Sequence, residues 1–296
     1  MRKLAKSLLL ICLISALSGT SWGEVKLGML AQRGAETALK EWGGIAAYLS
    51  EQLGEQVTIV PLPFSEFMDF CDVERSAFIF TNPWFYVKAK VKKDAKALVT
   101  VKYQKSGSMM GGVIFTRRDS GIKNLADLKG KILMCPKLSS PGGWLFAKGE
   151  IVKSGIIPEK DLKLLLETPK ESHDEVVYAV RDRKADVGTV RTNLLEAMNR
   201  EGKINIDDFL VLNETRHEGL NERCSTPLYP DWPVASLGNT PPELAVKMKA
   251  ALLGMQPGNP ALEQARKIER FVEALNYGPM EELCRRLNVE PFRKMH

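Results

Sequence analysis

The chain has 296 residues, of which 44% are hydrophobic, and a net charge of +6 at pH 7. That length is too great for one small core and suits two domains of ordinary size. The basic residues are not gathered into stretches with interleaved aromatic residues, so we expect no nucleic-acid partner. The five lysines of residues 88–96 are interpreted as a solvated helix face.

Residues 1–23 have the order of a secretory leader. Arg2, Lys3 and Lys6 are basic, residues 8–17 form an apolar run of about ten residues, and residues 18–23 supply small and polar residues. The run is shorter than the roughly 20 residues that a membrane span needs. We therefore expect export and cleavage after Gly23, leaving a soluble protein of net charge +3, because the leader carries three basic residues and no acidic residue.

Four cysteines follow the leader, and Cys12 lies inside the apolar run, a poor context for lipid modification. The wide spacing of the four excludes a Cys-x-x-Cys zinc or redox motif. An oxidising compartment allows up to two disulfides, and buried free thiols are the open alternative. The four residues are Cys71, Cys135, Cys224 and Cys284.

Short apolar runs then alternate with helical patterns in two series. The first predicts strands over residues 25–30, 57–62, 77–80, 97–103 and 110–116, with helices over 36–53, 65–71 and 84–92. The second predicts strands over 131–135, 162–167, 186–190 and 209–213, with helices over 143–154, 172–183 and 193–200. The remainder predicts helices over 242–253, 261–274 and 280–287.

This order predicts an α/β protein with two lobes, each built on a parallel sheet covered on both faces. Extended segments over residues 99–115 and 210–235 would form two hinge crossings between the lobes. The expected organisation is a leader over 1–23, lobe 1 over 24–104, lobe 2 over 105–225, and the second crossing with the return of lobe 1 over 226–296. The alternative is two independent domains in tandem, which the strand-poor last 60 residues disfavour.

Ligands of open α/β sheets bind beyond the carboxyl ends of the strands. The residues at these ends are rich in hydroxyl, amide, aromatic and arginine side chains, with few carboxylates, which favours an anionic ligand. The candidates are Arg33, Asn82, Trp84, Tyr86, Ser139, Ser140, Gly142, Gly143, His173 and Arg191, with Trp232 in the second crossing.

The segment from Ser139 to Gly143 precedes an apolar helix, where free N–H groups and the helix dipole make an anion site. An ordinary helix cap is the alternative there and at Asn82. Arg191 is placed either to bind an oxyanion or to pair with a carboxylate. His173 stands at the same predicted edge, and Trp232 is interpreted as a cleft wall or as hinge packing.

Several stretches resemble the periplasmic phosphate, phosphite and phosphonate-binding proteins of ABC transporters (the PhnD-like family). The chain is especially similar to the branch that serves as the sensing domain of membrane histidine kinases, including tetrathionate sensors. The matching stretches are residues 82–86, 119–122 with 125–131, 173–174, 185–192 with 195–196, and 225–233.

The resemblance implies a type II periplasmic-binding fold, with Ser139, Ser140, Gly142 and His173 as ligand contacts. The loop reads Ser139-Ser140-Pro141-Gly142 where phosphonate binders tend to read Ser-Thr-Ser-Gly, and Trp232 stands where they tend to carry an acid. Both departures disfavour an aminophosphonate and favour an oxyanion without an amine.

We therefore expect a periplasmic, monomeric solute-binding protein that delivers a small oxyanion to an ABC-transporter permease. The alternative is a sensing partner of a membrane histidine kinase. An enzyme acting on a small anion is a further alternative, but the chain lacks the common hydrolase, nucleotide-loop and zinc-protease motifs. No cofactor, metal or catalytic residue is expected.

Overall fold

The computed structural model describes residues 23–32, 34–74, 77–265 and 267–293. The predicted leader up to Trp22 and the candidate ligand residue Arg33 lie outside the described residues. In the described part of the chain, no helix combines the length and the apolar character that a membrane span needs.

Lobe 1 is built on a six-stranded sheet in the order β13-β4-β12-β3-β1-β2. β1 pairs in parallel with β2 and β3, whereas β12 and β13 pair antiparallel with their neighbours. The strands are β1 (Val25–Leu30), β2 (Val57–Leu62), β3 (Ala77–Phe80), β4 (Lys96–Tyr103), β12 (Pro233–Ser236) and β13 (Ile268–Glu273). The helices are α1 (Ala35–Leu53), α2 (Phe67–Val73), α3 (Pro83–Lys93) and α8 (Pro242–Gly254).

Lobe 2 is built on a five-stranded sheet in the order β10-β6-β9-β7-β8. β7 pairs in parallel with β8 and β9, and β6 runs antiparallel to β9 and β10. The strands are β6 (Gly112–Arg117), β7 (Ile132–Cys135), β8 (Leu164–Glu167), β9 (Val187–Arg191) and β10 (Phe209–Leu212). The helices are α4 (Phe146–Lys153), α5 (Pro158–Asp161), α6 (His173–Arg181) and α7 (Leu194–Arg200), with a π-helical turn over Pro141–Leu145 before α4.

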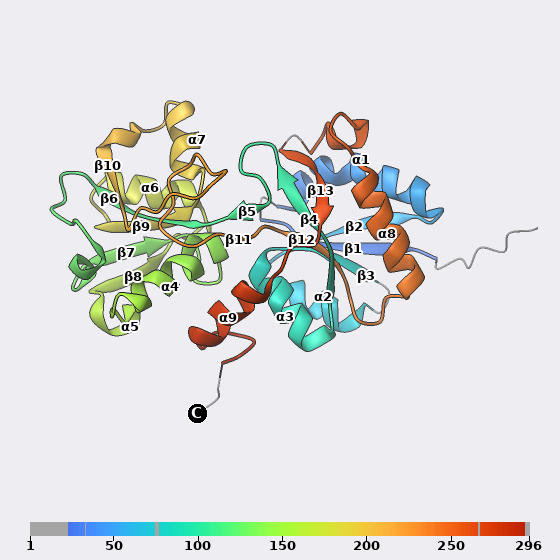
Figure 1. The fold of residues 1–296 in the computed structure, drawn as a ribbon, viewed down its shortest axis with the longest axis horizontal. Helices are drawn as coiled ribbons and strands as arrows, with labels where there is room; N and C mark the ends of the chain where they lie inside the picture. Colours follow the sequence, from blue (N-terminus) through green and yellow to red (C-terminus); the bar gives the residue numbers. More distant parts are fainter. Residues whose placement is uncertain (1–22, 33, 75–76, 266, 294–296) are drawn as a thin grey trace, which may run out of the picture.

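Two extended crossings join the lobes, and they pair with each other at the hinge. β5 (Met109–Met110) runs antiparallel to β11 (Tyr229–Pro230), and Asp231 N donates to Ser108 O at 2.9 Å just beyond that pair. Figure 1 shows the two lobes side by side with β5 and β11 between them and α9 (Gly278–Arg286) below. The expected fold class of two α/β lobes with two extended crossings is confirmed.

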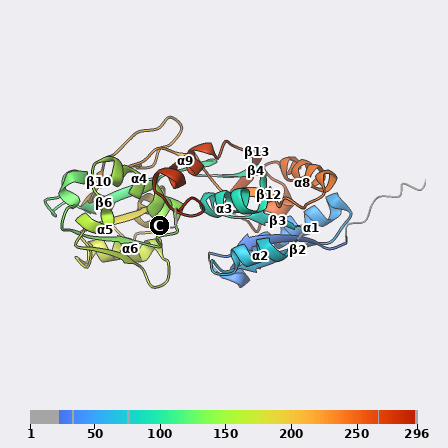
Figure 2. The same cartoon turned by 90° about the horizontal axis from the view of Figure 1, so that it is seen from below.

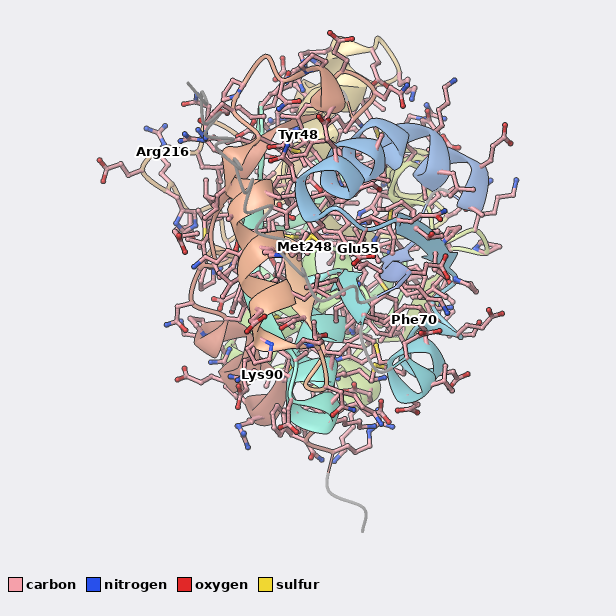
Figure 3. All side chains as sticks on the ribbon, turned by 90° about the vertical axis from the view of Figure 1, so that its right-hand side faces the viewer. Tyr48, Glu55, Phe70, Lys90, Arg216 and Met248 are labelled. Carbon is pink, nitrogen blue, oxygen red and sulfur yellow. The ribbon has the colours of Figure 1, made fainter. Side chains whose placement is uncertain are left out.

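Each lobe has its own apolar core. In lobe 1, Trp42, Ile45 and Leu49 of α1 are buried against the sheet. Helices α1 and α8 pack side by side over lobe 1, with Tyr48 on one and Met248 on the other (Figure 3). In lobe 2, separate apolar clusters cover the two faces of the sheet, so the expectation of sheets covered on both faces holds.

Two expectations about local structure are wrong. The sheets are mixed rather than parallel, because β12 and β13 join lobe 1 antiparallel and β6 runs antiparallel to β9 and β10 in lobe 2. The helix expected over residues 261–274 is instead a 3-10 turn over Pro260–Leu262 followed by the edge strand β13.

The four cysteines that the structure describes are buried free thiols, which decides between the two alternatives left open by the sequence. Burial raises the pKa of Cys71, Cys135 and Cys284 to about 12, so these thiols stay protonated and unreactive at neutral pH.

Candidate functional site

A cleft of about 420 Å³ lies between the two lobes, where the carboxyl ends of their parallel strands meet. Lobe 1 and the second crossing contribute residues that follow β1, β2 and β3, together with Trp232 and Lys267. Among the residues that line the cleft are Asn82, Phe64, Met110, Ser140, Gly142, Gly143, His173, Arg191, Leu194, Met198 and Trp232. The placement follows the strand-end rule for open α/β sheets.

Asn82 joins β3 to α3 and offers an unused donor to the cleft. Its Oδ1 accepts from Phe85 N at 3.0 Å as the N-cap of α3, and the residue is only 1% exposed. Among the residues that the structure describes, none provides a hydrogen-bond partner for Asn82 Nδ2. A buried amide without a partner costs about 1–3 kcal/mol, so a ligand oxygen at this position would recover that energy.

The turn from Ser140 to Gly143 brings the start of a helix to the cleft. Ser140 Oγ accepts from Gly143 N at 3.1 Å, with Pro141 at the first helical position. A Cβ on Gly142 would lie 2.6 Å from Met110 Cε and 3.0 Å from Arg191 Cβ, so the glycine allows this close approach. The helix start therefore packs closely against β9 and places the positive end of its dipole at the ligand space.

His173 opens α6 and is held neutral. Burial, with a smaller contribution from the charge of Arg191, lowers the pKa of His173 to about 3. Its Nδ1 accepts a long hydrogen bond of 3.4 Å from Arg191 N, which leaves the ring proton on Nε2. His173 therefore provides an N–H donor whose state is constant at ordinary pH.

Arg191 ends β9 and lies near an acid that sequence reasoning overlooked. Asp231, 5% exposed, follows β11 in the second crossing, and its carbonyl accepts from Tyr277 Oη at 2.6 Å. Burial raises the pKa of the Asp231 carboxyl to about 6, against the opposing effects of the hydrogen bond from Trp232 N and the charge of Arg191. The sequence offered one signal for Asp231: an acidic residue directly between a proline and the candidate ligand residue Trp232.

Lysines give the rim of the cleft a net positive charge. Lys137 pairs with Glu171 at 3.1 Å, and Lys203 pairs with Glu201 at 2.7 Å and with Asp174 at 3.3 Å. Lys170, Lys267 and Arg191 also line the cleft, so its lining has five cations and three carboxylates. This surplus favours anions and raises their local concentration.

Some predicted residues lie elsewhere. Trp84 Nε1 donates to Glu290 O at 2.7 Å, and Tyr86 Oη accepts from Ala97 N at 3.2 Å, so both side chains are engaged away from the cleft. Ser139 is partly buried and precedes the lining residue Ser140 without lining the cleft itself. Trp232 serves as both wall and hinge packing, since it lines the cleft and lies 5.1 Å from the ring of Phe80.

Two hinged α/β lobes around a donor-rich cleft define the class of bilobal solute-binding proteins. Where the structure describes the chain, no group of three or more His, Cys, Asp or Glu residues is arranged to hold a metal ion. A family model described as the periplasmic substrate-binding protein of a phosphonate ABC transporter matches residues 27–277. The chain belongs to this family of periplasmic substrate-binding proteins.

A sensor kinase is among the proteins similar to this chain. The tetrathionate sensor histidine kinase TtrS of Salmonella typhimurium (strain LT2) is 32% identical over 256 residues, which are 84% of this chain and 43% of that protein. This chain therefore spans less than half the length of that relative.

Solved structures of type II periplasmic binding proteins share the fold. PhnD1 of Prochlorococcus marinus (MIT 9301), in complex with methylphosphonate, matches with a TM-score of 0.67 at 17% identity, covering 90% of this chain and 98% of that one. The binding protein PA3383 of a phosphonate ABC transporter from Pseudomonas aeruginosa matches with a TM-score of 0.65 at 18% identity, covering 88% and 85%.

Proposed function

We propose that the chain binds a small oxyanion of phosphorus or sulfur in the interlobe cleft and delivers it to an ABC transporter. The observation that carries the proposal is the buried Asn82 Nδ2, which lacks a partner in the described residues and lines the same cleft as His173 and Arg191. Each of these groups, and the helix start at Gly142, presents a hydrogen-bond donor or a positive charge to the cleft. An anion would satisfy them together through charge-assisted hydrogen bonds.

A bound ligand would hold the two lobes together. Asn82 belongs to lobe 1 and His173 and Arg191 belong to lobe 2, so an anion that contacts all three is bound more tightly when the cleft is closed. A ligand with greater affinity for the closed form shifts the equilibrium toward it. Phe64, Met110 and Trp232 would exclude water from the bound anion.

The test is calorimetry with a panel of anions. Methylphosphonate and tetrathionate enter it because relatives are described with them, and phosphate, phosphite, sulfite and thiosulfate complete it. We expect at least one anion to bind with a Kd of roughly 10 µM or lower, about 7 kcal/mol of binding free energy. The amine-bearing 2-aminoethylphosphonate should bind more weakly than methylphosphonate, because the cation Arg191 lines the site. Absence of binding across the panel would contradict the proposal.

A second candidate function is ligand sensing for a membrane histidine kinase. It is favoured by the 32% identity to a sensor kinase over 84% of this chain. Affinity capture from membranes, with and without the bound anion, distinguishes the two functions. Capture of a kinase in the presence of ligand supports sensing, and capture of a permease alone supports transport.

Anion binding should weaken as the pH rises through about 6. Below that pH the Asp231 carboxyl is protonated and uncharged; above it the carboxylate competes with the ligand for the charge of Arg191. His173 contributes no change, because its pKa is about 3. Calorimetry between pH 5 and 7.5, with an anion whose own charge is constant there, should show a roughly fivefold to tenfold loss of affinity.

Asp231→Asn is the matched variant for this pH dependence. It should bind at pH 7.5 with the affinity that the wild type shows at pH 5, and its affinity should not vary over the range. A wild-type profile that is flat, or a variant that keeps the slope, would remove Asp231 from the electrostatics of the site.

A further inference from the structure

The segment from Tyr277 to Phe292, which contains α9, forms a third connection between the lobes. It begins at the hinge, where the Tyr277 hydroxyl donates to Asp231 O at 2.6 Å and lies 3.0 Å from Thr100 Oγ1. The Tyr277 ring packs against Tyr86 with centroids 4.7 Å apart, and the residue is 4% exposed. The start of the segment is therefore fixed to the hinge and to lobe 1.

The apolar face of α9 is buried where lobe 2, the second crossing and α3 meet. Met280, Leu283 and Cys284 are at most 1% exposed and belong to the core cluster that includes Trp144 of lobe 2, Tyr229 of the second crossing and Val87 of α3. A Cβ on Gly149 of α4 would lie 2.7 Å from Leu283 Cδ1, so the glycine lets the two helices approach closely. Because the contact with α4 is this close, we expect α9 to move with lobe 2 when the lobes rotate.

The polar face of the segment returns to α3 of lobe 1. Glu281 pairs with Lys90 at 2.7 Å and Glu290 pairs with Lys88 at 2.8 Å, the Lys88 side chain being 11% exposed. Trp84 Nε1 also donates to Glu290 O. Lys90 lies on α3, on the part of lobe 1 remote from α1 (Figure 3). These contacts are the ones that a rotation of the lobes would strain first.

The position of α9 relative to the hinge determines how closure of the lobes affects its contacts. Figure 2 shows α9 beside the hinge, on the side of the molecule away from α2 and α6. The ligand cleft includes residues at the start of α6 and just before α2, such as His173 and Phe64. Closure that brings α6 toward α2 therefore draws α3 away from α9 on the opposite side of the hinge.

We infer that this C-terminal segment sets the ligand affinity, because its ion pairs with α3 hold the lobes open and closure must loosen them. The inference rests on the proposed function, in which ligand favours the closed form. The apparent affinity of such a protein depends on the fraction of molecules that is already competent to bind. Weaker α3–α9 contacts should raise that fraction and tighten binding without any change in the cleft.

The test variant is Glu281→Gln/Glu290→Gln. Spin labels at Val73→Cys of α2 and Leu164→Cys of β8, both exposed positions, report the distance between the lobes, and the native cysteines are buried and should not react. In ligand-free protein, we expect pulsed EPR to show a larger population at short distance for the double variant than for the wild type. Calorimetry with methylphosphonate and tetrathionate should show roughly threefold to tenfold tighter binding, within the range for ion pairs of this exposure.

A matched control is Glu269→Gln/Glu273→Gln, which removes two ion pairs of similar length that lie within lobe 1, to Lys102 at 2.9 Å and to Lys249 at 2.7 Å. It should leave the distances and affinities unchanged. Lys90→Gln, which breaks one pair from the other side, should shift the distance in the same direction as the test variant. An unchanged or longer distance in both test variants overturns the inference, whereas a shorter distance with neither anion binding rejects the proposed ligand class alone.

Discussion

Asn82→Asp is expected to weaken anion binding at least 100-fold at pH 8 while leaving the fold intact. The new carboxylate keeps the oxygen that accepts from Phe85 N, and Asp is as good an N-cap as Asn. It replaces the unused Nδ2 donor with an oxygen at a position only 1% exposed, next to the bound anion. Like charges held close together at a desolvated contact cost several kcal/mol.

Calorimetry with the tightest anion of the panel measures this loss, and thermal unfolding checks the fold. Lowering the pH should restore part of the affinity, because a protonated carboxyl can donate a hydrogen bond. Asn259→Asp is the control, since Asn259 also precedes a proline and caps a short helix, with Oδ1 accepting from Ala261 N at 2.9 Å, away from the cleft. Equal affinities for Asn82→Asp and wild type would remove Asn82 from the site.

The order of the strands could be predicted because each is a short apolar run bounded by turn residues. The strands over residues 25–30, 57–62 and 77–80 begin and end as expected. β13 could not be predicted in this way. A register shift between Ile268 and Arg270 lets Ile268 and Phe271 both be buried although they are three residues apart, a spacing that resembles a helix. The charged residues between and after them lie along the edge of the sheet.

The site was predictable to the extent that strand ends determine it. Asn82, Ser140, His173 and Arg191 come from four predicted strand ends or helix starts and line one cleft. Trp84 and Tyr86 follow Asn82 on α3, where each residue turns by about 100° from the last, so they face other elements. The positions of Asp231 and of the rim lysines depend on how the second crossing and the loops fold back toward the cleft. The local sequence pattern does not encode that arrangement.

Arg191→Met is expected to have the second large effect, again a loss of affinity of about 100-fold. The charge of Arg191 acts on both the neutral His173 and the buried Asp231, and it lowers the pKa of each. Removing it takes away a charge-assisted contact with the anion and leaves the buried Asp231 without the positive charge that lowers its pKa. Truncating one member of such a buried charged group costs about 2–5 kcal/mol, part of it in stability.

The double variant Arg191→Met/Asp231→Asn separates the two losses. It removes the isolated acid, so thermal stability should return toward that of the wild type while the affinity stays low. Lys170→Met, which removes an exposed cation from the rim of the same cleft, should reduce affinity only about twofold to threefold, and less at high salt, because solvent screens it. Affinity that recovers together with stability in the double variant would make Arg191 a hinge residue and leave the anion to the remaining donors of the cleft.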